Sequence, residues 1–192
     1  LSMENVRFTV NLQRTPHENG LTGPDGNEYD FSENGIDKTE FLVATNTGEG
    51  LRPLAQIASG GEVSRLMLAL KAALQNNSGV STLVFDEIDA GIGARAGEIL
   101  GSKLWNVGRH HQVVCVTHLP QIAAYADQHF QVDKAVLLER TFSQVQPLNE
   151  TGRVKELASM LGGTPTTKVQ ESANELLSRA RTHKNSSRLL KN

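Results

Sequence analysis

Two apolar runs on either side of a helical pattern constrain the fold of this chain more than any other feature. Residues 80–85 and 112–117 are continuous apolar runs of strand length. Residues 94–107 between them carry apolar side chains at helical spacing, with an expected inner face of Ile99, Leu100, Leu104 and Val107. The order strand, helix, strand predicts an α/β fold with a mostly parallel sheet flanked by helices. Strands of such sheets are covered on both faces, so we expect both runs to be fully buried.

Further elements surround this unit. Residues 6–12 alternate apolar and polar side chains and predict a strand, as do residues 41–45 beyond a turn-rich stretch. A helix is predicted over residues 60–75, with an apolar stripe of Val63, Leu66, Met67, Leu70 and Leu74. Downstream, the pattern predicts a short helix, two strands that can form a hairpin, and two helices, over residues 120–125, 130–133, 135–139, 153–161 and 169–181.

The chain therefore divides into four segments. We expect a strand-rich lead-in (1–58), a core with the polar motifs (59–145), C-terminal helices (146–182) and a basic tail (183–192). From Arg179 onward the chain carries basic residues and no acidic one. Two interpretations of that end stay open: a frayed, solvated terminus, or a contact with nucleic acid.

Composition excludes several classes of protein. The formal net charge of −2 gives no global basic field for nucleic acid. No apolar run approaches the roughly 20 residues that span a bilayer, and Leu1–Glu4 do not resemble a signal peptide. The single cysteine, Cys115, lies in an apolar strand pattern, so we expect an inert packed thiol, in keeping with a reducing cytoplasm.

Ser59-Gly60-Gly61-Glu62 precede the predicted helix 60–75. Ser59 and Glu62 fit a capping box, which is a purely structural device. Two glycines in a first helical turn are costly for the helix, but they expose backbone N–H groups and leave room for another molecule. A helix cap and an anion-binding site therefore remain alternatives for this segment.

Polar, titratable residues follow both apolar runs. Asp86 and Glu87 close the first run, and His118 follows the second. Ligands of open α/β sheets bind at the carboxyl ends of the strands, so these side chains are expected at one edge. Asp86 suits Mg²⁺ and Glu87 suits a general base. The alternatives are a solvated acidic turn and a structural histidine.

The ordered set of these motifs resembles the ATP-binding-cassette (ABC) ATPases. The resemblance implies a P-loop nucleotide hydrolase fold in which Ser59, Gly60, Gly61 and Glu62 are the signature that touches ATP held by a second head. It implies that Asp86 is the Walker B residue for Mg²⁺, Glu87 the catalytic base, His118 the catalytic switch histidine, and Asp89 the D-loop residue that crosses the interface. The leucine common before the signature serine is Ala58 here, which weakens a similarity to the transporters of the family.

Denser similarity links the chain to the RecN family of bacterial DNA repair proteins, relatives of the SMC and Rad50 proteins. It lies in residues 41–46, 48–49, 51–54, 58–70, 116–121 and 156–163. In that family a coiled coil splits the ATPase head. This chain, which has no G-x-x-x-x-G-K-[ST] loop, is thus expected to be the C-terminal lobe of a split, SMC-like head.

The resemblance also implies a function and partners. The expected function is an ATP-driven, dimerising head in repair of DNA double-strand breaks by recombination. ATP and Mg²⁺ are the expected cofactors. The expected partners are the P-loop lobe, a second head, DNA and a recombinase, without a membrane, in the bacterial cytoplasm at the nucleoid. The alternatives are the nucleotide-binding domain of a transporter and a clamp head that does not hydrolyse ATP.

Overall fold

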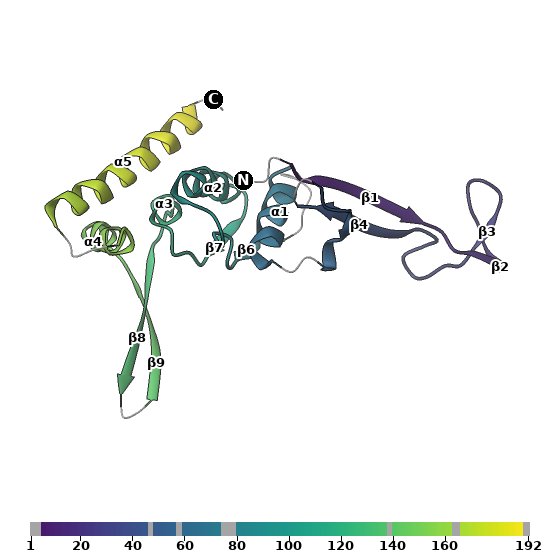
Figure 1. The fold of residues 1–192 in the computed structure, drawn as a ribbon, viewed down its shortest axis with the longest axis horizontal. Helices are drawn as coiled ribbons and strands as arrows, with labels where there is room; N and C mark the ends of the chain where they lie inside the picture. Colours follow the sequence, from purple (N-terminus) through teal and green to yellow (C-terminus); the bar gives the residue numbers. More distant parts are fainter. Residues whose placement is uncertain are drawn as a thin grey trace. The chain divides into compact units, whose positions relative to one another are not determined.

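The computed structural model describes residues 5–45, 48–56, 59–73, 80–137, 140–162 and 166–189. It divides the chain into two compact units, which are described separately: one is Met3–Ser59, and the other begins at Gly60 and continues to Asn192. Figure 1 shows the elements of both units along the chain.

The N-terminal unit is built of antiparallel strands. Strand β1 (Arg7–Gln13) pairs with β4 (Lys38–Ala44), which also pairs with β5 (Arg52–Pro53) before the 3₁₀ turn η1 (Leu54–Gln56). The strands predicted over 6–12 and 41–45 are thus confirmed, the first to within one residue, while the second begins three residues earlier than expected. Strands β2 (Pro16–Thr22) and β3 (Glu28–Tyr29) form a second pair, at the far end of the β1–β4 ribbon, in the stretch expected to be turns (Figure 1).

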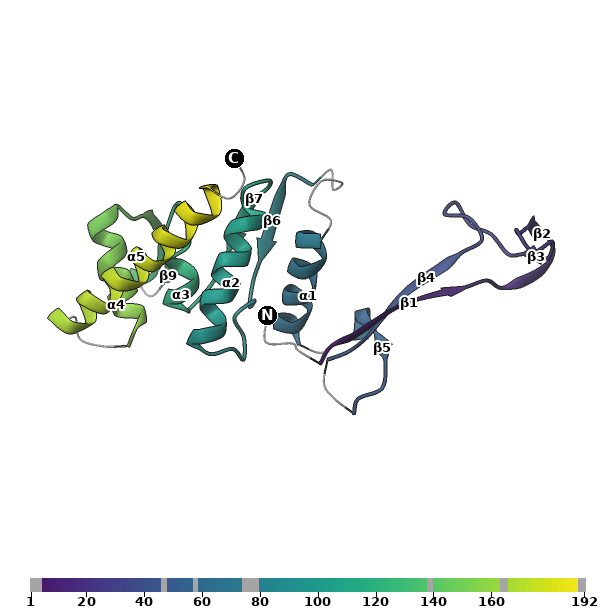
Figure 2. The same cartoon turned by 90° about the horizontal axis from the view of Figure 1, so that it is seen from above.

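The C-terminal unit contains the predicted strand, helix and strand. Helix α1 (Gly60–Ala73) leads to β6 (Thr82–Phe85), α2 (Ala94–Val107), β7 (Gln112–Cys115) and the short helix α3 (Pro120–Ala123). Strands β6 and β7 are parallel neighbours, with Thr82 opposite Gln112 and Phe85 opposite Cys115. Helices α1 and α2 lie side by side along these strands (Figure 2). Residues 74–75 of the predicted first helix lie outside the described residues.

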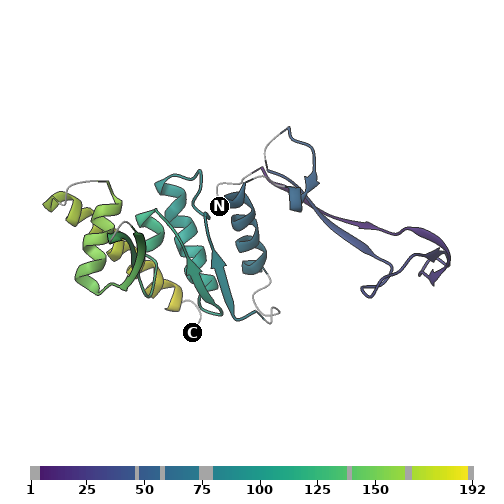
Figure 3. The same ribbon diagram turned by 90° about the horizontal axis from the view of Figure 1, so that it is seen from below.

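The expectation that both strands are buried on both faces is wrong for this chain. One face of the β6–β7 pair packs on the helices through Leu83, Phe85, Val113 and Cys115. The other face leaves Val84 69%, Val114 45% and Val116 59% exposed. Figure 3 shows the two strands from below, with the helices behind them. The helices cover one face, and no described segment covers the second. Ile99 and Met67, expected on inner helix faces, are also exposed, at 49% and 38%.

The expectation of a mostly parallel sheet is also wrong. Among the described strands, β6 and β7 are the parallel pair, and the other pairings are antiparallel. The predicted hairpin exists, but its strands are β8 (Phe130–Leu137) and β9 (Arg140–Pro147), which extend away from the helices in Figure 1. Strand β8 runs through the expected break near residue 134: Lys134 interrupts the alternation of apolar and polar residues, but its pairing with Ser143 continues the strand.

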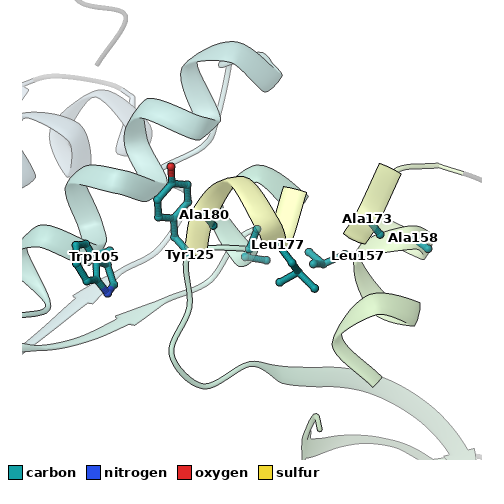
Figure 4. Close-up of a cluster of buried hydrophobic side chains, with 9 residues drawn as sticks. Trp105, Tyr125, Leu157, Ala158, Ala173, Leu177 and Ala180 are labelled. Carbon is teal, nitrogen blue, oxygen red and sulfur yellow. The ribbon is translucent and has the colours of Figure 1, made fainter. Parts of the chain in front are cut away.

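Two helices complete the unit, α4 (Glu150–Met160) and α5 (Thr167–Leu189). They pack on α2 and α3 through a cluster of small and apolar side chains shown in Figure 4: Trp105, Tyr125, Leu157, Ala158, Ala173, Leu177 and Ala180. A second cluster joins α1 and α2 to β6 and holds Leu68, Phe85, Ile88, Leu100 and Leu104, with Val107 and Ile122 beside them. Alanines at the helix contacts let the backbones of α4 and α5 approach closely.

The basic end of the chain is helical to Leu189, beyond the boundary expected at residue 182. Three basic side chains of its described part are paired with carboxylates of the same unit. Arg179 pairs with Glu175 at 2.5 Å, Arg181 with Glu150, and Lys184 with Asp127 at 2.7 Å. Pairing on the protein itself reduces the charge available to phosphates, which argues against the nucleic-acid interpretation for these three residues. Among the described helices, none has the length and apolar character needed to cross a membrane.

Candidate functional site

The parallel register of β6 and β7 brings the predicted polar residues to one edge. Asp86 and Glu87 follow β6 directly, and His118 lies three residues beyond the end of β7. Phe85 accepts a hydrogen bond from the backbone N–H of Val116 at 2.9 Å, so the two strand ends stay together past their paired residues. The carboxyl ends of both strands thus form one polar edge, as the sequence predicted.

Glu87 stands out at this edge by its backbone conformation. Its φ is +54°, in the left-handed region that residues other than glycine rarely adopt. Both Asp86 and Glu87 are exposed, and Asp86 Oδ1 accepts a hydrogen bond from the Glu87 backbone N–H at 2.9 Å. The Glu87 carboxylate forms no hydrogen bond or ion pair with the described residues. It is therefore free to accept a proton from a bound molecule.

Helix α1 holds the turn that carries these carboxylates. The Ser64 hydroxyl donates to the carbonyl of Asp86 at 3.1 Å. One nitrogen of Arg65, Nη1, donates to the carbonyls of Ile88 at 3.2 Å and Ala90 at 2.9 Å. Arg65 is 7% exposed, and sequence reasoning missed it. The available signal was its spacing from Gly61 and Leu68, which places a charged residue on the buried stripe of the helix.

The two signature glycines have a structural reason within this chain. A Cβ at Gly60 would lie 2.9 Å from Glu87 Oε2, and a Cβ at Gly61 would lie 2.9 Å from the Glu87 carbonyl oxygen. The first turn of α1 therefore packs directly on the Glu87 turn. The expectation that the glycines leave room for another molecule needs this correction: at Gly61 the space is taken by the chain itself. Ser59 belongs to the other unit, and the capping box stays a prediction.

Asp89 is buried and binds the end of β7. Its side chain is 3% exposed, and Oδ2 accepts hydrogen bonds from the Thr117 hydroxyl at 2.5 Å and the His118 backbone N–H at 2.9 Å. The same oxygen lies 3.1 Å from His118 Nδ1. In this conformation the Asp89 side chain holds His118 within the chain. The D-loop role across an interface, which the resemblance implied for Asp89, stays a prediction. The imidazole of His118 is 73% exposed at the edge.

Cys115 lies below this edge and is unsuited to nucleophilic chemistry. Burial, and to a smaller extent the negative charges of Asp89 and Asp86, raise the pKa of its thiol to about 12. A thiol with so high a pKa stays protonated at neutral pH and reacts slowly. The expectation of an inert, packed cysteine therefore agrees with the structure.

The donors at the edge fit a magnesium–nucleotide complex only as half of a site. Asp86 keeps one carboxylate oxygen without a hydrogen bond from the described residues, and Mg²⁺ needs only one or two carboxylates beside water and phosphate. Within the described ranges, no group of three or more His, Cys, Asp or Glu side chains could hold a metal ion alone. The chain has no P-loop, so the residues that would grip the phosphates must come from elsewhere.

Comparison with known proteins finds close relatives in sequence. DNA repair protein RecN of Halalkalibacterium halodurans is 39% identical over 178 residues, which cover 92% of this chain and 30% of that protein. DNA repair protein RecN of Xylella fastidiosa is 44% identical and that of Treponema pallidum 47%, over 90% and 85% of this chain. The chain spans only about 30% of the length of the curated relatives it matches. No protein-family model matches it.

Solved structures show the fold. The Smc head domain of Pyrococcus yayanosii, solved with a coiled coil and joint, matches 82% of this chain with a TM-score of 0.55 and 19% identity. An Smc head domain of Pyrococcus furiosus, with an extended coiled coil and bound to the C-terminal domain of ScpA, matches 83% with a TM-score of 0.51 and 19% identity. The chain covers 26% and 34% of those chains, so it has the α/β fold of part of an Smc head.

Proposed function

Because the chain is a segment of a protein of the RecN family, we propose that it forms the C-terminal lobe of an ATP-hydrolysing head that acts in DNA repair. The observation that carries the proposal is the edge at which Asp86, Glu87 and His118 meet, with the Glu87 carboxylate unengaged by the described residues. An exposed acid at the same edge as an oriented imidazole suits proton transfer to and from water.

The architecture of the chain supports a missing lobe. Parallel sheets in α/β proteins have both faces covered, yet Val84, Val114 and Val116 are exposed on one face of the β6–β7 pair. A lobe that carries the P-loop would cover this face and supply the phosphate grip that the chain lacks. In the proposed head that lobe precedes this chain, separated from it by a coiled coil.

Each residue at the edge has a proposed task. Asp86 would hold Mg²⁺, and Glu87 would take the proton of the attacking water. His118, fixed through Asp89, would donate a hydrogen bond where negative charge develops. ATP would supply the phosphoryl group, and Mg²⁺ would neutralise its negative charge, as in other phosphoryl transfers.

The first turn of α1 has a second proposed task in dimerisation. Helix N-termini attract phosphate through their free N–H groups and the helix dipole. Ser59, Gly60 and Glu62 would meet the nucleotide held by a second head, so that the nucleotide joins two heads. Gly61 would act mainly by letting this turn lie against Glu87.

The other functions considered have less support. A transporter domain is expected to carry a mostly helical insert before the signature, whereas the described residues before Gly60 form strands and one 3₁₀ turn. A clamp head without hydrolysis would not need an unengaged Glu87 carboxylate. The proposal includes DNA and a recombinase as partners, and the bacterial cytoplasm at the nucleoid as the location.

The test is ATP hydrolysis by the intact protein and its Glu87→Gln variant. We expect hydrolysis to fall at least about a hundredfold in the variant, because the amide cannot accept the proton. ATP binding is expected to persist, and ATP-bound dimers should accumulate in size-exclusion chromatography. Unchanged hydrolysis in the variant would contradict the role of Glu87 as base.

A further inference from the structure

We propose that Arg65 is a positioning residue that sets the conformation of Glu87 and thereby couples helix α1 to the hydrolytic step. The proposal rests on the proposed function of the edge as an ATPase site. It concerns a residue of the helix interior, one turn away from the signature, to which the motifs of the chain assign no role.

The turn after β6 depends on α1 for its hydrogen bonds. Its carbonyls at Asp86, Ile88 and Ala90 accept hydrogen bonds from only two side chains, those of Ser64 and Arg65. The intervening carbonyl of Glu87 accepts the Ala90 N–H at 2.9 Å and faces Gly61. Side chains of α1 thus hold the carbonyls on both sides of Glu87, those of Asp86 and Ile88. Glu87 itself adopts its left-handed φ of +54°.

A stabilising role alone does not account for an arginine at this position. Arg65 is 7% exposed, and within the described residues it pairs with no carboxylate. Its Nε is buried without a hydrogen-bond partner there. A buried charge and an unsatisfied N–H both cost free energy, and apolar residues of similar volume often serve stability as well or better. What the guanidinium provides, and an apolar side chain cannot, is one donor shared by two carbonyls of the turn.

The consequence is a direct connection between two parts of the site. The N-terminus of α1 is proposed to meet the nucleotide of a second head, and four residues later the same helix fixes the turn of its own catalytic base. A shift of α1 when two heads meet would move the carbonyls of Ile88 and Ala90, and with them the Glu87 carboxylate. A displacement of about 1 Å can change a catalytic rate about a hundredfold.

The experiment uses the intact protein and compares Arg65→Met with Arg153→Met. Arg153 is a matched control: it is 8% exposed, and its Nη2 donates to the carbonyls of Ala126 at 2.9 Å and Ala124 at 3.5 Å, away from the carboxylate edge. We expect the two variants to change in thermal stability by similar amounts, because the two arginines are equally buried and each has an unsatisfied Nε. Only Arg65→Met is expected to lower kcat, by at least about tenfold, with the KM for ATP within about twofold.

Two further variants keep the test decisive if Arg65→Met folds poorly. Arg65→Lys retains the charge and a donor and should give an intermediate kcat, and Ser64→Ala should lower kcat by less. In a Glu87→Gln background, Arg65→Met should lower the residual single-turnover rate no further, because both changes act through one carboxylate.

Equal losses of kcat in the two methionine variants would overturn the proposal. So would a full additional loss in the Glu87→Gln background. A wild-type protein that binds ATP without hydrolysing it would overturn the proposed function itself, and this positioning role with it.

Discussion

Alanine substitutions at Gly60 and Gly61 separate the two roles of the first turn of α1. At Gly61 an added Cβ would lie 2.9 Å from the Glu87 carbonyl oxygen and 3.0 Å from Ala90 Cβ. Carbon atoms at optimal separation lie about 3.5–4.0 Å apart, so the turn would have to move by about 0.5 Å or more.

The cost at Gly61 follows from two opposing effects. Overpacking costs about 1–3 kcal/mol, and the higher helix propensity of alanine returns about 1 kcal/mol. We therefore expect Gly61→Ala to lower the free energy of unfolding by about 1 kcal/mol, which is about 2–4 °C in Tm for a chain of this size. At Gly60 the added Cβ would meet Glu87 Oε2, the end of a side chain that can rotate away. Gly60→Ala should therefore raise Tm by about 2–4 °C through the helix propensity of alanine, and it should displace the carboxylate.

Both variants are expected to lower kcat in the intact protein, although only one lowers Tm. Gly152→Ala is the control: Gly152 also lies in a first helical turn, where its Cβ would meet Asn149 Oδ1 and Leu148 Cδ2 at 3.3 Å, far from the carboxylates in sequence. Thermal unfolding and steady-state ATP hydrolysis measure the two quantities. If Gly61→Ala raised Tm and kept kcat, the packing of this turn on Glu87 would be refuted.

Three further predictions follow from single side chains. Ser59→Arg should abolish ATP-dependent dimerisation while leaving ATP binding intact, measured by light scattering and by nucleotide titration; loss of binding itself would contradict its role toward a second head. Cys115 should resist a thiol reagent until the chain unfolds. Because its pKa is raised from 9.0 to about 12, its contribution to stability should be complete below pH 9.0 and decline as the pH rises toward 12. Denaturant titrations at several pH values would measure this decline. Leu157→Ala, at a site with 0% exposure, should cost about 2–5 kcal/mol in unfolding free energy with no change in kcat per folded molecule; a loss below about 1 kcal/mol would show that this core relaxes around the cavity.

The polar edge was predictable because its signal is local. An apolar run that ends in Asp86-Glu87, and a second that ends before His118, specify strand ends by composition alone. The helix between them then requires parallel neighbours, which places both ends at one edge. The placement of Asp86, Glu87 and His118 at one edge was therefore predicted without coordinates, and their roles stay predictions.

Other features depend on contacts between distant residues. The role of Arg65 arises from carbonyls 23 and 25 positions away, and no pattern within a helix reports them. Strand β9 was missed because its apolar residues Phe142 and Val145 lie three positions apart, which does not fit the alternation of a strand. Its pairing with β8 holds this segment as a strand. The bare face of β6–β7 was unpredictable for a different reason: apolar composition shows that a face should be covered, but not which segment covers it.

That bare face affects how the protein can be made in the cell. In the proposed head, the P-loop lobe leaves the ribosome first and waits while the coiled coil is synthesised. During that interval each half-sheet has apolar side chains and strand edges in water, the condition in which chains aggregate. Val84, Val114 and Val116 would make this lobe a client of chaperones until its partner docks. Production of the two lobes together should accordingly give more soluble material than production of either alone.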